Sequence, residues 1–173
     1  MAMFPTRPIA DTDLHLPVLG LGTVPIAGRY ENIPVSQARG TLDTAYRLGI
    51  RHFDCSPYYG YGLAERYVGD CLRYRPYILS TKVGRRLLPG AEPYRHNPIW
   101  QKPLPFHPVF DYSYNGIMRS FEDSLQRLGL DRIDFLLVHD IDVAYEQSKK
   151  HAVDLLNDGY RALTTLKNSG HIK

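Results

Sequence analysis

Four polar residues of this chain stand where apolar segments end, and together they could move a proton. Asp54 closes one apolar segment, and Tyr59 follows it by five residues. Lys82 and His139 each come directly after a further apolar segment. A parallel α/β sheet gathers its chemistry at the carboxyl ends of its strands, so this pattern indicates an acid–base site.

Each of the four residues also has an ordinary structural explanation. Asp54 could cap a strand, Tyr59 could be a surface aromatic, Lys82 a solvated charge and His139 a partly buried histidine with its hydrogen bonds satisfied. Their joint position at the ends of successive strands favours the catalytic interpretation. Tyr58 competes with Tyr59, and the five-residue spacing from Asp54 favours Tyr59, leaving Tyr58 to pack or to line the substrate.

The elements that must position these residues read as four strand-then-helix units, which predicts an α/β fold. Strand 133–138 is almost continuously apolar, as expected for a parallel strand covered on both faces. A small hairpin at 8–14 precedes the first unit, and 171–173 reads as the start of a fifth strand. The expected strands are 16–23, 51–54, 77–81 and 133–138, and the expected helices are 36–48, 64–72, 113–128 and 152–168. In the last helix the residues expected to face inward are Leu155, Leu156, Tyr160, Leu163 and Leu166.

A long stretch, 85–112, separates the third strand from the third helix. It contains six prolines and Trp100, the single tryptophan, and it reads as an irregular loop over the catalytic end. Loops of this length are usually functional or disordered. Its aromatic residues could form a lid that recognises substrate or could simply pack on one another. Arg85 and Arg86 could contact a cofactor phosphate, although solvated charge is the commoner role.

Composition excludes several classes of protein. At 173 residues, 43% hydrophobic and 23% charged, the chain has the composition of a soluble globular domain. The net charge of +3 is mild and the cations are scattered, so we expect no nucleic-acid partner. No apolar run approaches the ~18 residues of a membrane span, and the N-terminus lacks an apolar signal core, so we expect no membrane partner and a cytoplasmic protein.

The cysteines and the acidic residues give no metal-binding pattern. Cys55 and Cys71 have no metal or disulfide spacing, and both read as small reduced side chains. His139 is followed by Asp140 and Asp142, but without a second histidine cluster this sequence does not predict a metal site. We therefore expect no bound metal.

Several motifs together resemble the aldo-keto reductases, a family of (β/α)8 TIM-barrel oxidoreductases that use NAD or NADP. The match runs in order from Leu19 to Lys173. The residues that carry it are Leu19-Gly20-Leu21-Gly22-Thr23, Phe53-Asp54 with Tyr58-Tyr59-Gly60 and Glu65, Ser80-Thr81-Lys82-Val83, and Leu136-Leu137-Val138-His139-Asp140. The closest resemblance is to the aldose 1-dehydrogenases, for L-fucose or D-threo-aldose, and to pyridoxal 4-dehydrogenase-like enzymes.

The resemblance assigns a role to each candidate residue. Tyr59 is the general acid/base, Lys82 the cation that stabilises its phenolate, Asp54 the partner of Lys82, and His139 the group that orients the substrate oxygen. Gly22, Thr23 and Val24, together with Asp54, are expected at the nicotinamide, and Tyr58 and Trp100 at the substrate. From the residues alone, segment 20–25 is only a weak indication of a cofactor site. It lacks the third glycine of a dinucleotide-binding fingerprint, and Pro25 prevents a helix from starting there.

The resemblance, together with the length, implies that residues 1–173 are the N-terminal half of a single barrel, with about the first four βα units. A (β/α)8 barrel takes roughly 200 residues at minimum. The family resemblance places most cofactor-binding groups in strands five to eight. The expected partners are therefore a small aldose or pyridoxal, with a second copy or a complementary half-barrel needed to complete the fold. A non-catalytic half-barrel that acts in assembly is the alternative.

Overall fold

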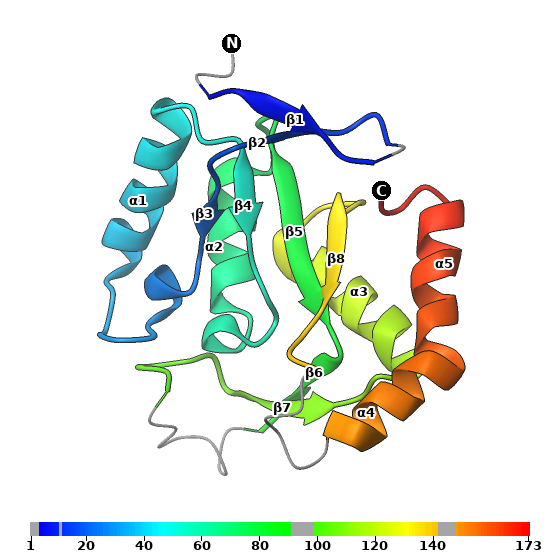
Figure 1. Cartoon of the computed structure of the whole chain (residues 1–173). Helices are drawn as coiled ribbons and strands as arrows, with labels where there is room; N and C mark the ends of the chain where they lie inside the picture. The colour runs from blue at the N-terminus through cyan, green and yellow to red at the C-terminus, as the bar shows by residue number, and fades with distance from the viewer. Residues whose placement is uncertain (1–3, 11, 91–98, 142–147) are drawn as a thin grey trace.

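The computed structural model describes residues 4–10, 12–90, 99–141 and 148–173. A four-stranded parallel sheet forms its centre, and helices lie along the outside of that sheet (Figure 1). The sheet strands are β3 (Leu21–Gly22), β4 (His52–Asp54), β5 (Ile78–Val83) and β8 (Phe135–Val138). The α-helices are α1 (Val35–Arg47), α2 (Leu63–Leu72), α3 (Tyr114–Leu128), α4 (Ser148–Asp154) and α5 (Tyr160–Asn168). Short 3-10 turns cover Pro25–Ala27 and Tyr59–Tyr61.

The strand order β3-β4-β5-β8 follows the chain order, and every neighbouring pair is parallel. This confirms the prediction of successive βα units that form part of a (β/α)8 barrel. In the register, Gly22 lies opposite Asp54 and Asp54 lies opposite Ser80. Side chains of alternate strand residues share a face, so Asp54, Ser80 and Lys82 all belong to the same face of the sheet.

The core lies between the other face of the sheet and the helices. Phe53, Val68, Leu42 and Leu128 are fully buried there, and each contributes about 1.5–3 kcal/mol by leaving water. A side chain at Gly69 would overlap the backbone of Leu128, so this glycine is what lets helices α2 and α3 approach closely.

Helix α3 has the signals that its sequence predicts. Ser113 accepts a hydrogen bond from the amide of Gly116 and caps the N-terminus. Gly129 ends the helix in the left-handed conformation, which costs glycine little.

The expectation that the last strand is covered on both faces is wrong. Leu137 in β8 is 46% exposed, whereas Leu136 packs against the core from the neighbouring position. The part of the sheet that the structure describes has four strands and does not close around its inner face. Leu137 therefore stays accessible on that face.

The first expected strand, 16–23, is divided between two sheets. His15–Pro17 forms strand β2, which pairs antiparallel with β1 (Thr6–Pro8), and only Leu21–Gly22 joins the parallel sheet. The expected hairpin exists, but its strands lie on either side of 8–14. Figure 1 shows the β1–β2 hairpin across one end of the sheet.

The last expected helix is interrupted. Leu155–Gly159 forms a π-turn between α4 and α5. Leu156 is 76% exposed and Tyr160 is 63% exposed, so the prediction that both face inward was wrong, while Leu166 is buried as expected. A π-turn inserts an extra residue and rotates the helical faces that follow or precede it, which shifts the apolar stripe.

The stretch 85–112 is more regular than expected. It holds an antiparallel pair, β6 (Arg85–Pro89) and β7 (Phe106–Phe110), where the sequence predicted irregular structure. This pair follows β5 directly and lies across the opposite end of the sheet from β1–β2 (Figure 1). Residues 91–98 of the stretch lie outside the described residues.

The chain end continues the barrel pattern in its hydrogen bonds. Residues 171–173 are not a strand, but the amide of Ile133 donates to the carbonyl of His171, and the amide of Lys173 donates to the carbonyl of Asp134. The segment thus pairs with the residues just before β8, where a fifth strand was expected.

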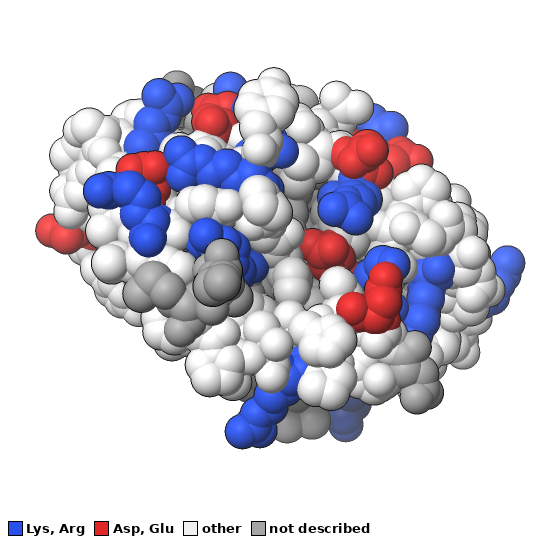
Figure 2. All heavy atoms as spheres, turned by 90° about the horizontal axis from the view of Figure 1, so that it is seen from above, with Lys and Arg blue, Asp and Glu red and all other residues white. Residues whose placement is uncertain are grey.

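The surface charges are mixed. Figure 2 shows Lys and Arg side chains next to Asp and Glu on the face seen from above. Among the helices of the described ranges, none has the length and apolar character needed to cross a membrane.

Candidate active site

Asp54 and Lys82 form the centre of the site. The Lys82 ammonium donates to Asp54 Oδ2 at 2.6 Å and to the carbonyl of Cys55 at 2.9 Å. Ser80 donates to the other carboxylate oxygen at 2.7 Å, so Asp54 is held from both sides. Burial opposes the charge on Lys82, but the hydrogen bond and attraction of Asp54, with Tyr59 contributing, outweigh it and raise the pKa of Lys82. Lys82 is therefore a fixed ammonium.

Tyr59 lies beside this ammonium. Lys82 Nζ is 4.8 Å from the centroid of the Tyr59 ring. Tyr59 is the first residue of a 3-10 turn, and its backbone amide donates to the carbonyl of Ser56. Gly60 follows with a φ of +59°, and a Cβ there would overlap the backbone of Ala27, so the tight turn that presents Tyr59 requires glycine.

His139 approaches the same place from the end of β8. It is 4% exposed, and its ring lies 6.0 Å from the Tyr59 ring, centroid to centroid. Its amide donates to the carbonyl of Val83, and its own carbonyl accepts a hydrogen bond from the Tyr112 hydroxyl. Burial, together with the nearby charges of Arg85 and Lys82, lowers the pKa of His139 to about 3. The imidazole is therefore neutral near pH 7.

Arg85 is not the solvated charge that the sequence favoured. Its side chain is 4% exposed and pairs with Asp140 at 2.8 Å. Its guanidinium also lies 4.5 Å from the Tyr58 ring centroid. Arg86 pairs with Asp111 at 3.3 Å.

Tyr59, His139 and Arg85 are among the residues that line a cavity of about 270 Å³. Residues that line it include Val24, Tyr58, Tyr59, Trp100 and His139. Trp100 is 4% exposed and its ring packs against both tyrosines, with centroids 5.8 and 6.0 Å away. The structure thus brings Tyr59 and His139 together with both expected substrate residues around one space, while Asp54 and Lys82 lie outside its lining and reach it through the Tyr59 ring.

The residues expected at the nicotinamide differ in exposure: Thr23 is buried, whereas Gly22 and Val24 are accessible. Thr23 is fully buried and its hydroxyl donates to the carbonyl of Asp54, so its side chain holds β3 to β4. Gly22 leaves open space where a Cβ would stand, and Val24 lines the cavity. Gly22 and Val24 therefore present an accessible edge next to Asp54.

Three residues that contribute to the site were not predicted in these roles. Ser56 binds the His139 ring, Ser80 binds Asp54, and Asp140 pairs with Arg85. One signal was available: Ser80 lies two residues before Lys82 on a strand, so it shares the face that carries the lysine. The Ser56 contact spans 83 residues of sequence and had no local signal.

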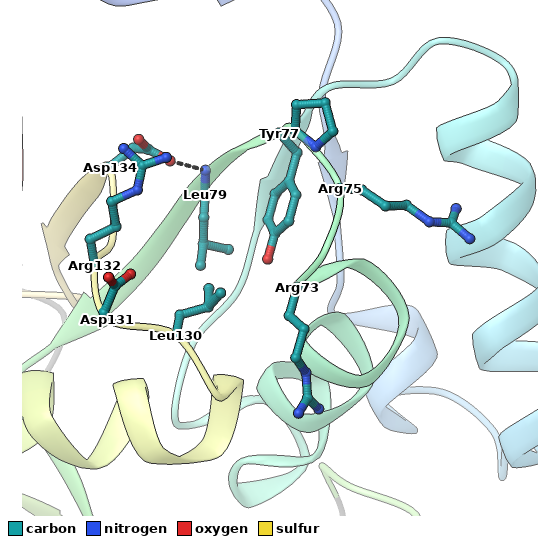
Figure 3. A pocket seen from close by; sticks show the side chains of 9 residues that line it. Arg73, Arg75, Tyr77, Leu79, Leu130, Asp131, Arg132 and Asp134 are labelled. Atoms are coloured by element: carbon teal, nitrogen blue, oxygen red, sulfur yellow. Dashed lines mark hydrogen bonds between the residues drawn. The ribbon is translucent and has the colours of Figure 1, made fainter.

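A second cavity, of about 200 Å³, lies at the other end of the sheet (Figure 3). It is next to residues that precede β5 and β8, including Arg73, Arg75, Tyr77 and Arg132. Figure 3 shows the three guanidinium groups pointing in different directions, and Arg75 is paired with Asp43. They do not converge on a common ligand position.

Across the described ranges, no three His, Cys, Asp or Glu side chains are grouped closely enough to hold a metal ion. Cys55 and Cys71 are both free thiols.

Comparison with known proteins defines the family. Residues 18–173 match the aldo/keto reductase family, and the chain belongs to it. Among solved structures it resembles an aldo-keto reductase from Bacillus halodurans in its holo form, with a TM-score of 0.71 and 28% identity over 98% of this chain and 48% of that one.

Individual relatives share between a third and almost half of their aligned residues with this chain. Pyridoxal 4-dehydrogenase of Microbacterium luteolum is 44% identical over 96% of this chain and 53% of its own length. D-threo-aldose 1-dehydrogenase of a Pseudomonas species is 33% identical over 99% of this chain and 53% of its own length. The chain thus spans about half the length of these relatives.

Proposed function

We propose that this chain carries the proton-transfer groups of an NAD(P)-dependent dehydrogenase that oxidises the hemiacetal carbon of an aldose to a lactone. Tyr59 is the general base of this reaction, Lys82 and Asp54 support it, and His139 orients the reacting hydroxyl. The observation that carries the proposal is the Lys82 ammonium, which is salt-bridged to Asp54 and lies against the Tyr59 ring.

The charges in the site support this direction of proton transfer. Lys82 is 13% exposed, so its ammonium acts through little water and interacts strongly with a charge next to it. A phenolate at Tyr59 is the anion best placed to receive that stabilisation. Removal of a hydroxyl proton by Tyr59 then leaves an electron pair on oxygen, which forms the C=O bond as the C–H bond breaks.

His139 contributes orientation. The neutral imidazole lines the cavity next to Tyr59 and can hydrogen-bond the same substrate oxygen without competing for its proton, since its pKa is about 3. Two groups that contact one oxygen fix its position relative to the phenolate.

The open edge at Gly22 and Val24, beside Asp54, suits the nicotinamide end of the cofactor, which backbone groups could hold there. When bound, NAD(P)+ would accept the hydrogen of the C–H bond together with the electron pair of that bond, as a hydride. Trp100 and Tyr58 provide apolar ring surface that excludes water from the reacting carbon.

Pyridoxal is the second candidate substrate. It is favoured by the 44% identity with pyridoxal 4-dehydrogenase, and its hemiacetal presents the same C–H and O–H groups as a cyclic aldose. The aromatic side chains Trp100 and Tyr58 could also stack on a pyridine ring.

The test is turnover and cofactor binding by the purified chain. Formation of reduced nicotinamide is followed with L-fucose, a D-threo-aldose or pyridoxal and either cofactor, while calorimetry measures NAD+ and NADP+ binding and light scattering measures the mass in solution. Tyr59→Phe should lower kcat by at least about 100-fold. The matched control is Tyr74→Phe, because Tyr74 is 94% exposed and remote from the cavity.

Two results would contradict the proposal. Full activity of Tyr59→Phe with loss of activity in Tyr58→Phe would transfer the role to the neighbouring tyrosine. Absence of both binding and turnover, with the chain present as a stable oligomer, would favour a non-catalytic half-barrel that acts in assembly.

A further inference from the structure

The inference concerns Ser56, a buried residue between Asp54 and Tyr58. Its side chain is completely inaccessible to solvent. Ser56 Oγ lies 3.0 Å from Nδ1 of His139, and it accepts a hydrogen bond from the amide of Tyr58, also at 3.0 Å. The hydroxyl oxygen therefore already accepts a backbone hydrogen bond, and the hydroxyl hydrogen still needs an acceptor.

Among the described residues that contact Ser56 Oγ, the only acceptor for that hydrogen is Nδ1 of His139. If Nδ1 carried a hydrogen, Nδ1–H and the Tyr58 amide would both donate to Ser56 Oγ. The buried hydroxyl hydrogen of Ser56 would then lack an acceptor among these contacts. Leaving a buried donor unpaired is unfavourable. The surroundings of Ser56 thus favour an unprotonated Nδ1.

The other side of the ring leads to the same assignment independently. Nε2 of His139 lies 3.4 Å from Oδ2 of Asp140, and the Arg85 guanidinium binds that same oxygen at 2.8 Å. In the described structure these two atoms form no hydrogen bond, but the negative charge of the carboxylate would repel a lone pair on Nε2. A hydrogen on Nε2 would instead be attracted, so this contact favours a protonated Nε2.

We propose that Ser56 is a positioning residue that fixes His139 as its Nε2–H tautomer and so directs an N–H donor into the cavity. The substrate oxygen would accept this hydrogen bond, while Tyr59 exchanges a proton with the same oxygen. The catalytic consequence rests on the proposed function, but the tautomer itself does not.

Because His139 is neutral near pH 7, the two tautomers differ in what they can do. Nε2–H is a donor and suits a substrate oxygen, whereas an unprotonated Nε2 is an acceptor and would repel the lone pairs of that oxygen. The hydroxyl of Ser56 therefore determines whether the histidine helps or hinders substrate binding at this position.

The first experiment is nitrogen NMR of the histidine rings in the purified chain near pH 7. The ring of His139, assigned by its loss in His139→Asn, should show a protonated Nε2 and an unprotonated Nδ1. In Ser56→Ala the Nδ1 resonance should move toward that of a nitrogen with no hydrogen-bond donor, and Ser56→Thr, which retains the hydroxyl, should restore it. A protonated Nδ1 in the unsubstituted chain would overturn the proposal.

Ser120→Ala is the matched control. Ser120 on α3 is 1% exposed, as buried as Ser56, but within the described part of the chain its hydroxyl has no hydrogen-bond partner. This variant reproduces the loss of a buried serine hydroxyl and should leave the His139 resonances unchanged. Equal shifts of the Nδ1 resonance in both alanine variants would show a general structural effect and would contradict the role of Ser56.

The second readout is turnover. Ser56→Ala should lower kcat by about tenfold, the effect expected from one misdirected hydrogen bond, with a smaller change in KM. If the unsubstituted chain shows no turnover, the proposed function fails, but the NMR result still tests the tautomer. Unchanged kcat in an active Ser56→Ala variant would overturn the catalytic consequence.

Discussion

The ion pair between Glu65 and Arg127 gives the clearest prediction for stability. Glu65 on α2 has a fully buried side chain, and its two oxygens accept hydrogen bonds from Thr81 at 2.7 Å and from Arg127 Nε at 2.6 Å. Arg127 on α3 is 15% exposed and also donates to Ser124. Replacing Arg127 by Met keeps most of its apolar length but leaves the carboxylate buried with a single hydroxyl donor.

The cost follows from that burial. Removing one partner of a buried ion pair costs about 3–5 kcal/mol because the remaining charge has lost its compensation. Domains of this size are stable by only about 5–15 kcal/mol, so Arg127→Met should remove a large part of the free energy of unfolding. Glu65→Gln added to Arg127→Met should recover much of the loss, because a neutral amide can still accept the hydrogen bond from Thr81.

The assay is unfolding in urea, and the chain offers a matched control. Arg119 lies on the same helix and pairs with Asp123 at 3.2 Å, but it is 60% exposed. An exposed pair contributes about 0–1 kcal/mol, so Arg119→Met should shift the midpoint little. If the two arginine variants unfold at the same urea concentration, with unchanged slopes, the reasoning from burial is refuted.

Three further predictions concern the site. Gly84→Ala should destabilise the chain by about 2 kcal/mol or more, because Gly84 has a φ of +99° and a Cβ would overlap an aromatic ring. Gly40→Ala on α1 is the control, because a Cβ there meets nothing, and it should not destabilise the chain. Comparable losses of stability for the two variants in urea unfolding would contradict this prediction. The lowered pKa of His139 means that the unfolded chain binds more protons between about pH 3 and pH 6.5, so stability should rise with pH in that window, by about 5 kcal/mol in total. This contribution should disappear in His139→Asn and persist in a variant of the exposed His15, as followed by unfolding at several pH values; an unchanged pH slope in His139→Asn would count against a buried neutral imidazole. Lys82→Met should lower kcat by at least about 100-fold in an active preparation, since it removes the cation beside the reacting phenol, and activity within a few-fold of the original would exclude that role.

Much of the fold could be predicted from local sequence signals. Asp54 ends β4 and His139 follows β8, as the apolar segments indicate, whereas β5 continues past the expected 77–81 to Val83, so that Lys82 is its last residue but one. Parallel order brings all three residues to one end of the sheet. The expected helix 113–128 agrees with α3, whose ends are set locally: capping by Ser113 and Gly129 depends on a few neighbouring residues.

What the sequence could not provide depends on contacts between distant residues. The pairing of Arg85 with Asp140, and of Ser56 with His139, joins residues 55 and 83 positions apart, so neither contact leaves a periodic signal. The exposure of Leu156 was missed because the π-turn changes the helical phase within an otherwise regular apolar pattern.

Gly84 also provides a probe of the assembled site. Where another residue would have its Cβ, Gly84 has a hydrogen that points at the ring of Tyr112, whose hydroxyl holds the carbonyl of His139. The magnetic field of the aromatic ring must displace the resonance of that hydrogen from the usual glycine position. This single proton signal therefore reports, in the unlabelled chain and without any ligand, whether Tyr112 is seated and the histidine backbone is anchored.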